Sequence, residues 1–236
     1  MHIPSRFGWL GRSVAGLFIW LLVGERALAY DNIIQVPNHY PTIQEAVNHA
    51  KPGQWIFVRP GVYNEVVSVN NKKLLIYGHP GEHPTIRGGF VMEGTENSIH
   101  EVDIVVVDDA PAIVVDGGYG GLIRDTVLRN NIIYPASDNS GAGNGIFLKS
   151  CDRCQVIGNY IDGFSGSGLY LDGDSAGTLV KGNTISHNGT GISLAARSKF
   201  FQVMNNDVMH NEACDIENKG QQNLLRRNDA SRICGK

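Results

Sequence analysis

The feature that most constrains the fold is a short phrase that the sequence repeats at a nearly constant interval. Each copy has an apolar residue, two variable residues, an asparagine, one variable residue and a second apolar residue. Successive copies are 29, 24, 23 and 22 residues apart, measured between the asparagines Asn130, Asn159, Asn183, Asn206 and Asn228. An interval of this size is typical of a solenoid, in which each repeat forms one layer of a stack.

A second phrase, apolar-x-apolar, recurs in step with the first, and its copies begin at Ile146, Leu169, Ile192 and Cys214. Two short alternating segments per repeat, bounded by Gly, Asn and Ser, are typical of β-strands joined by turns. The interval leaves little room for a helix, and the Leu-x-x-Leu-x-Leu skeleton of leucine-rich repeats is absent. The sequence therefore predicts an all-β coil of parallel strands, with asparagine amides hydrogen-bonded from one coil to the next.

The first 29 residues predict a secretory signal peptide. Two arginines precede an apolar run at residues 14–23, and Ala-Leu-Ala at residues 27–29 has the small-x-small pattern of a cleavage site. The apolar run is short for a membrane anchor, which is the rival interpretation. We therefore expect residues 30–236 to form one secreted or periplasmic domain, with no membrane association after cleavage.

The charge balance argues against a nucleic-acid partner. The net charge is −3 and no basic stripe stands out along the sequence. With 29 glycines and 8% aromatic residues, the composition fits a turn-rich all-β chain. We expect a monomer.

Four cysteines follow the predicted signal peptide. Cys151-x-x-Cys154 resembles half of a zinc site or a redox pair, but no second ligand pair and no helix follow it. We therefore predict no metal site here, and expect one local disulfide between Cys151 and Cys154. A second disulfide is expected between Cys214 and Cys234, on the last coil.

One helix is predicted ahead of the repeats, over residues 42–50. Thr42-x-x-Glu45 forms a capping box, and apolar residues follow at helical spacing. A stack of open coils exposes its core and its strand edges at the first coil. We expect this helix to cover that end.

Three segments near this helix carry a family resemblance: YPTIQEAV at 40–47, IFVRPGVYNE at 56–65 and LLIYG at 74–78. They are similar to the opening of right-handed parallel β-helix proteins of the pectin lyase-like superfamily, and the later Asn-x-Ile phrases resemble its generic repeats. The resemblance implies a single-stranded right-handed parallel β-helix with an N-terminal capping helix. It also implies lyase or epimerase chemistry on an acidic polysaccharide, while another branch of the superfamily is copper-related.

The catalytic motifs of the best-known enzymes of that superfamily are absent. The Asp-Phe-Ile-Phe-Gly segment of pectin methylesterases, the Trp-Ile-Asp-His segment of calcium-dependent pectate lyases and the Asp-Pro-His of alginate epimerases have no match. No catalytic residue is therefore carried over from the resemblance.

Strand alternation gives the candidate site. If the apolar residues of the second phrase point inward, the residues between them point outward, in rows about 4.8 Å apart from coil to coil. Phe147 and Tyr170 then form an exposed aromatic pair, Lys149 lies near Asp172, and Asp174 lies near Arg197. Ser193, Asp215 and Glu217 are also assigned to the outer face.

Aromatic rings beside carboxylates and a cation suit a sugar ring that carries uronate groups. We predict Phe147 and Tyr170 as substrate-binding residues, and Lys149, Arg197, Asp172 and Asp174 as the catalytic set. In lyase or epimerase chemistry Arg197 or a bound cation would neutralise the sugar carboxylate and Lys149 would remove the neighbouring proton. The alternative is aromatic packing and charge pairing between coils, without catalysis.

Two further features bear on the site. About six extra residues around residues 134–143 lengthen one repeat, and insertions in stacked folds often form the wall of a binding face, so Tyr134 is a third candidate substrate-binding residue. Near Asp108, which we take as the asparagine position of a degenerate repeat, an acidic segment would suit calcium, the one cofactor considered. Solvated turn carboxylates are the favoured interpretation.

His187 and His210 occupy equivalent positions in adjacent repeats. They predict either a paired-histidine metal site or two turn residues, and no third ligand can be named. The sequence therefore leaves three functions open: a lyase-like or binding protein for an acidic polysaccharide, a non-catalytic scaffold or adhesion module, and a periplasmic metal-handling accessory.

Overall fold

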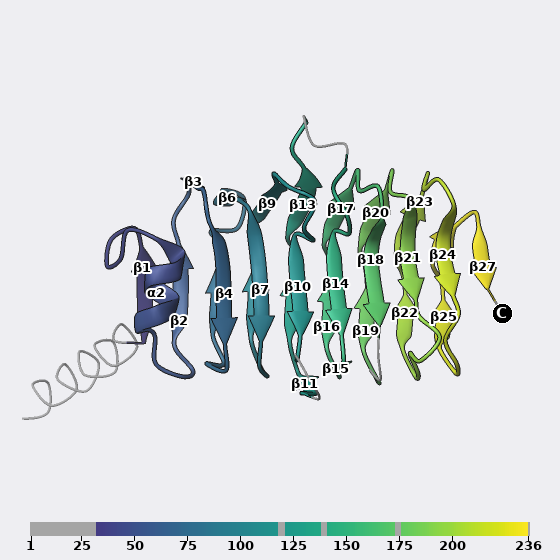
Figure 1. The fold of residues 1–236 in the computed structure, drawn as a ribbon, viewed down its shortest axis with the longest axis horizontal. Helices are drawn as coiled ribbons and strands as arrows, with labels where there is room; N and C mark the ends of the chain where they lie inside the picture. The colour runs from purple at the N-terminus through teal and green to yellow at the C-terminus, as the bar shows by residue number, and fades with distance from the viewer. Residues whose placement is uncertain (1–31, 118–120, 138–140, 173–175, 236) are drawn as a thin grey trace, which may run out of the picture. The chain divides into compact units, whose positions relative to one another are not determined.

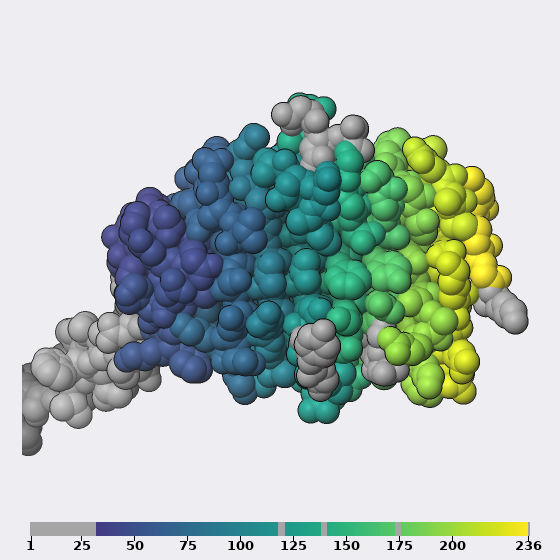
Figure 2. All heavy atoms as spheres, in the orientation of Figure 1, coloured from purple at the N-terminus to yellow at the C-terminus, as the bar shows by residue number. Residues whose placement is uncertain are grey.

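A computed structural model describes residues 32–117, 121–137, 141–172 and 176–235. Residues 34–236 form one compact unit, and the coils follow one another in sequence order (Figure 2). The predicted signal peptide lies outside the described residues. Within the described part, no helix is long and apolar enough to cross a membrane.

Three parallel sheets form the faces of the coil (Figure 1). Sheet A contains β1 (Ile33–Val36), β2 (Trp55–Val58), β5 (Leu75–Tyr77), β8 (Ser98–His100), β12 (Val127–Arg129), β16 (Gln155–Ile157), β19 (Leu179–Lys181), β22 (Gln202–Met204) and β25 (Leu224–Arg226). Sheet B contains β3 (Val62–Tyr63), β6 (Thr85–Arg87), β9 (Asp103–Val106), β13 (Ile132–Pro135), β17 (Tyr160–Asp162), β20 (Thr184–Ser186), β23 (Asp207–Met209) and β26 (Asp229–Ala230). Sheet C contains β4 (Val66–Asn70), β7 (Gly89–Glu93), β10 (Ile113–Asp116), β14 (Ile146–Lys149), β18 (Ser167–Asp172), β21 (Thr190–Leu194), β24 (Cys214–Asn218) and β27 (Ile233–Gly235). A fourth, two-stranded sheet pairs β11 (Ile123–Arg124) with β15 (Cys151–Asp152), so the predicted parallel β-helix is confirmed.

The core runs along the inside of the three sheets. In sheet C, Ile146 pairs with Leu169 and Leu169 with Ile192, and all three side chains are fully buried. Equivalent apolar residues therefore stack from coil to coil, each removing its side chain from water against its neighbours. The predicted inward set of the second phrase is confirmed.

The predicted asparagine ladder lies at the bend between sheets A and B. Asn159 donates from its backbone N–H and from Nδ2 to Asn183 Oδ1, at 2.9 and 3.0 Å. Asn183 donates in the same way to Asn206, at 3.0 and 2.9 Å. The ladder continues to Asn228 at one end and Asn131 at the other.

The first copy of the repeat was misassigned by one residue. Leu128 pairs with Val156, so the ladder residue is Asn131 and not Asn130, which lies in the turn with φ 52°. The repeat pattern fits both Val127-x-x-Asn130 and Leu128-x-x-Asn131. Burial decides between the two alignments, because the Leu128 side chain lies in the core whereas Val127 is only half-buried.

Asp108 is also wrong as a ladder position. Val102 takes that place, since its backbone N–H donates to Asn131 Oδ1 at 3.3 Å.

The predicted N-terminal helix is α2 (Ile43–His49). Thr42 Oγ1 accepts a hydrogen bond from the Glu45 N–H at 3.1 Å, and the Glu65 carboxylate accepts from the N–H groups of Ile43 and Gln44, both at 2.9 Å. Three of the four orphan N–H groups of the first turn are thus satisfied. Ile43, Ala46 and Val47 are buried against the coil, so the capping role is confirmed (Figure 1).

Both predicted disulfides are confirmed. Cys151 is bonded to Cys154, and Cys214 in β24 is bonded to Cys234 in β27. The first closes a turn beside β15, and the second fastens the last strand of sheet C to its neighbour.

Removing the second disulfide is expected to destabilise the protein more than removing the first. The Cys214–Cys234 bond joins residues 20 apart, and in the chain-entropy model a loop of this length contributes about 3 kcal/mol. Replacing both cysteines with serine should lower the free energy of unfolding in urea by about this amount. The same change at Cys151 and Cys154, which are 3 residues apart, serves as the control, and an equal loss there would contradict the expectation.

Candidate functional site

The predicted aromatic pair lies on the outer face of sheet C. Phe147 in β14 pairs with Tyr170 in β18, and their rings are stacked with centroids 5.5 Å apart and planes 10° apart. On the other side of Tyr170 the neighbour in the row is Ser193, whose side chain is short. One face of the Tyr170 ring is therefore covered by Phe147, and no second ring from the described residues stacks on the other.

Beyond Ser193 the row continues to Glu217 in β24. The Glu217 carboxylate accepts from Ser193 Oγ at 3.0 Å and pairs with Lys219 Nζ at 2.7 Å. The hydrogen bond from Lys219 lowers the pKa of Glu217, although partial burial opposes it, so this carboxylate is charged at neutral pH.

Tyr170 remains protonated in this setting. Burial raises the pKa of its hydroxyl, and the nearby charge of Asp172 raises it further. At neutral pH the hydroxyl can therefore donate a hydrogen bond.

A shallow depression of about 430 Å³ adjoins Tyr170 at the edge where the strands of sheet C begin. Its lining spans three coils and is mostly small or polar: Asn144, Ser165, Gly166, Ser167, Tyr170, Gly189, Thr190, Glu212 and Ala213. A Cβ atom added at Gly189 would lie 2.2 Å from the backbone oxygen of Ser165, so only glycine lets these turns stack so closely. Hydroxyl, amide and carboxylate groups thus surround one half-buried aromatic ring.

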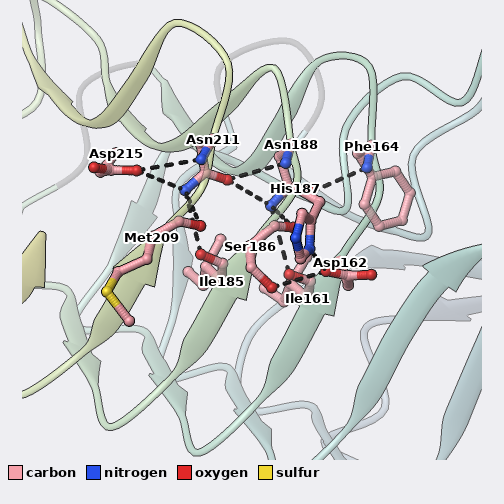
Figure 3. A network of polar contacts seen from close by, with 10 residues as sticks. All are labelled: Ile161, Asp162, Phe164, Ile185, Ser186, His187, Asn188, Met209, Asn211 and Asp215. Atoms are coloured by element: carbon pink, nitrogen blue, oxygen red, sulfur yellow. Dashed lines mark hydrogen bonds and ion pairs between the residues drawn. The ribbon is translucent and has the colours of Figure 1, made fainter. Parts of the chain in front are cut away.

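A second polar ladder, not anticipated from the sequence, supports the turns that line this depression (Figure 3). The Phe164 N–H donates to Asn188 Oδ1 at 3.0 Å, and the Asn188 N–H donates to Asn211 Oδ1 at 3.0 Å. Asn211 in turn donates from Nδ2 to Asp215 Oδ1 at 3.1 Å. Because these residues are buried next to Gly189 and Glu212, the floor of the depression is held in one conformation.

Asp215 is therefore a correction, because we assigned it to the outer face. It is 1% exposed, and its Oδ2 accepts from the backbone N–H groups of Ser231 at 3.0 Å and Arg232 at 2.8 Å. Alternation fails here because Asp215, near the start of β24, accepts hydrogen bonds from backbone N–H groups of two turns, the one after β23 and the one before β27. Burial alone would raise the pKa of Asp215, but the hydrogen bonds from Arg232, Asn211 and Ser231 outweigh it and lower the pKa.

Asp215→Asn is expected to destabilise the protein at pH 7 by about 1–3 kcal/mol, because an amide NH₂ would face two N–H donors. The folded-state pKa is lowered, so the carboxylate stabilises the fold above the unfolded value of about 3.9 and loses this effect as the pH falls through the folded value. Urea unfolding of both proteins should therefore show a difference at pH 7 that shrinks below pH ~4. A difference independent of pH would contradict the assignment.

Lys149 lies on the outer row beside Phe147. It is paired in register with Asp116 on one side and Asp172 on the other, and its Nζ is 3.1 Å from Asp116 Oδ2. The predicted proximity to Asp172 is confirmed, although the ion pair that forms is with Asp116. Because the Lys149 amine already contacts the Asp116 carboxylate, this geometry suits charge neutralisation better than removal of a sugar proton.

The other predicted catalytic residues do not gather around Lys149. Arg197 is exposed in the turn after β21, two coils beyond β14, which corresponds to about 10 Å between backbones. Asp174 lies outside the described residues, so its pairing with Arg197 stays a prediction.

Tyr134 is not part of the aromatic row on sheet C. It lies in β13 of sheet B, paired with Val105, and is 36% exposed. The residue just after the insertion does reach the depression, because Ser167 N–H donates to Asn144 Oδ1 at 2.7 Å and Asn144 lines the hollow. The segment that follows the insertion thus contributes an amide to the site, and none of the described insertion residues lines the hollow.

The two histidines stack as predicted, with ring centroids 5.7 Å apart. Both have left-handed backbone conformations, with φ of 52° and 59°, and His187 Nδ1 is 2.8 Å from Asp162 Oδ1. Their turn role is confirmed. Across the described residues, no group of three or more His, Cys, Asp or Glu side chains is placed to hold a metal ion, and the calcium prediction stays untested.

Sequence reasoning missed two polar groupings. The second ladder had a visible signal, because the pair His-Asn recurs at residues 187–188 and 210–211. The other is His83, whose Nδ1 is 2.8 Å from Asp103 Oδ1 and whose Nε2 is 3.0 Å from Glu101 Oε2. No spacing rule connects these three residues, since they come from a turn and the next coil.

Comparison with known proteins gives the same architecture. A family model described as "Right handed beta helix region" matches residues 88–236. The crystal structure of pectate lyase Pel9A is similar with a TM-score of 0.57 and 13% identity, over 72% of this chain and 48% of that one. ORF18 of Geobacillus virus E2 is similar with a TM-score of 0.61 and 13% identity, over 90% of this chain and 51% of that one. The chain thus spans about half the length of these two structures, and at this identity the likeness concerns the fold.

No curated protein sequence matches the chain.

Proposed function

Because the chain belongs to the right-handed β-helix family, we propose that it is a carbohydrate-active protein that holds a polysaccharide across sheet C. The single observation that carries this proposal is the environment of Tyr170. One face of its ring is stacked on Phe147, and the residue also lines a depression of about 430 Å³. A sugar has an apolar CH face and a rim of hydroxyl groups. The site matches both, because the Tyr170 ring can stack on the CH face and the polar residues around it can bind the hydroxyl groups.

The polar surround would bind the sugar hydroxyls. Glu217 and Glu212 can accept hydrogen bonds, while the amide of Asn144 and the hydroxyl of Thr190 can both donate and accept. Serine and glycine residues leave room for the ring, and the ladder beneath them keeps the donors and acceptors in place. Such preorganisation favours binding because few side chains lose conformational entropy when the sugar binds.

We further propose that the polysaccharide is acidic. Support comes from the likeness in fold to pectate lyase Pel9A, a protein named for an acidic polysaccharide. Lys149 and Lys219 each follow a member of the Tyr170 row, Phe147 or Glu217, by two residues, and each already pairs with a carboxylate. A uronate would therefore share these cations with Asp116 and Glu217, or bind through calcium.

Binding without turnover is the function that this geometry favours. β-Elimination and epimerisation both require a neutralised carboxylate and a base at one sugar. Lys149 is held in an ion pair and Arg197 comes from a coil two layers away. Lyase or epimerase activity with Lys149, Arg197 and Asp172 therefore remains the second candidate function.

We also propose that the protein works outside the cytoplasm. Two disulfides among the described residues need an oxidising compartment, and the expected signal peptide would direct the chain there.

The proposal is tested with the mature protein and a panel of soluble polysaccharides that contains polygalacturonate, alginate and a neutral mannan, with and without calcium. Affinity electrophoresis should show retardation by an acidic polymer, while ultraviolet absorbance shows no unsaturated product and NMR shows no change in sugar composition. An absorbance increase or an altered composition would favour the enzyme. No retardation by any polymer would overturn the proposal in favour of the scaffold.

A further inference from the structure

Charge is divided unevenly among the outer faces of the coil. Sheet C presents Glu93, Asp116, Asp172 and Glu217, and sheet B presents Asp103, Asp162, Asp207 and Asp229. In sheet A, none of the outward-facing residues of the nine described strands is acidic. In a chain with a net charge of −3, this leaves one face that is free of carboxylates along its strands.

One row of sheet A carries cations. From Tyr77 the register continues through His100, Arg129, Ile157, Lys181 and Met204 to Arg226. Burial lowers the pKa of His100, and the Arg129 charge lowers it further, so this ring is neutral at pH 7. Within the described part of the chain, Arg129, Lys181 and Arg226 form no ion pair, unlike Lys149 and Lys219 on sheet C. Their charges are therefore available to an external anion.

Aromatic side chains form the other end of the same face. Trp55 is 47% exposed, its ring centroid is 6.2 Å from that of Tyr77, and the Phe57 ring is 5.2 Å from Tyr77. Phe57 and Tyr77 are register partners, so this cluster leads directly into the cationic row. An exposed aromatic platform on a strand surface marks a contact site, and it suits the CH face of a sugar.

The cations recur on every second coil. Arg129, Lys181 and Arg226 lie on β12, β19 and β25, with β16 and β22 between them. Neighbouring coils are about 4.8 Å apart, so successive cations are separated by about 10 Å. This distance is comparable with the length of two linked hexoses, and in an extended two-fold chain the carboxylates on one side recur every second sugar.

We propose that the outer face of sheet A is a second binding surface, separate from Tyr170, for an extended anionic polysaccharide. The chain runs across the coils, with sugar rings on Trp55, Phe57 and Tyr77 and carboxylates on Arg129, Lys181 and Arg226. The positive charges of the row indicate an anionic ligand, and their spacing indicates the distance between its charges. The choice of a polysaccharide rests on the proposed function. Nucleic acid is the disfavoured polyanion, because its phosphates are far denser along the chain than these cations.

The test uses calorimetry at low salt with the mature protein and either polygalacturonate or alginate. Arg129→Gln combined with Lys181→Gln is expected to weaken binding by at least about tenfold, because two charge-assisted contacts are lost. The matched control is Arg87→Gln with Lys199→Gln, which removes two exposed charges away from the strands of sheet A and should change affinity by less than about threefold. An equal loss in the control would mean a net-charge effect and would overturn the inference.

Two further arms separate the alternatives. Trp55→Ala should weaken polyuronate binding without changing the net charge, and an unchanged affinity would count against the surface. A single-stranded oligonucleotide should bind more weakly than the polyuronate, and tighter binding that is lost in the Arg129 and Lys181 variant would replace the polysaccharide with a nucleic acid.

If Tyr170→Ala abolishes polyuronate binding and the sheet A variant does not, the proposed function stands and this inference fails. The reverse pattern would locate acidic polysaccharide binding on sheet A alone.

Discussion

Asn183→Leu is expected to lower the free energy of unfolding by about 3 kcal/mol or more. Asn183 is 1% exposed and takes part in both directions of the ladder. It accepts from Asn159 N–H and Nδ2, and it donates to Val156 O and Asn206 Oδ1 at 2.9 Å each. Leucine has a similar size but leaves these buried groups without partners, and each unsatisfied group costs about 1–3 kcal/mol.

Urea unfolding measures this loss, and Asn130→Gly provides the matched control. Asn130 belongs to the same written pattern but lies one residue off the ladder, where its exposed Nδ2 donates to Glu101 at 2.6 Å. Its replacement should cost less than about 1 kcal/mol, because glycine accepts the left-handed backbone conformation at this position and water can solvate the Glu101 carboxylate. Similar losses in the two variants would show that the ladder does not stabilise the coil more than an ordinary turn contact.

Tyr170→Ala is expected to reduce the affinity for the bound polysaccharide by at least about tenfold, or roughly 1.4 kcal/mol. The substitution removes the only ring that both stacks on Phe147 and lines the depression among the described residues. Stacking aromatics are among the side chains whose loss weakens an interface most. Affinity electrophoresis with the polymer that retards the wild type gives the ratio directly.

The matched control for this experiment is Tyr160→Ala. Tyr160 lies on sheet B and is 42% exposed, so it tests the loss of an exposed tyrosine away from the depression. Its affinity should stay within about twofold of the wild type, since surface changes away from a site are nearly neutral. A loss as large as that of Tyr170→Ala would contradict the site on sheet C.

Much of the fold could be predicted because each repeat of a solenoid contacts only its neighbours, so the period of the sequence determines how the coils stack. The spacing of Asn159 and Asn183 gives the period, and alternation around Leu169 gives the inner face, so the aromatic neighbours Phe147 and Tyr170 follow. Both disulfides were also within reach, because each joins cysteines that the repeat places on the same or adjacent coils.

The errors occur where two local patterns compete or where a turn intervenes. The repeat motif can be aligned with either Asn130 or Asn131 at the ladder position, and only the burial of Leu128 shows that Asn131 is correct. At Asp215 alternation assigned an outward side chain, but unsatisfied N–H groups of the last turns required a buried acceptor. Both outcomes depend on contacts between coils that no single repeat contains.

The candidate site was predictable only in part. Its aromatic pair comes from one strand row, whereas the depression is formed by three turns whose relative heights depend on close stacking at Gly189. The cationic row of sheet A was hidden for a related reason. Arg129, Lys181 and Arg226 are far apart in the sequence and become a row only once the register is known.

The most direct test of the central claim is a crystal structure of the mature protein with an oligosaccharide cut from the polymer that binds. We predict a sugar ring against the face of Tyr170 that Phe147 leaves uncovered, with its hydroxyl groups directed toward Glu217 and the depression. An oligosaccharide bound elsewhere, with Tyr170 uncovered, would contradict the account.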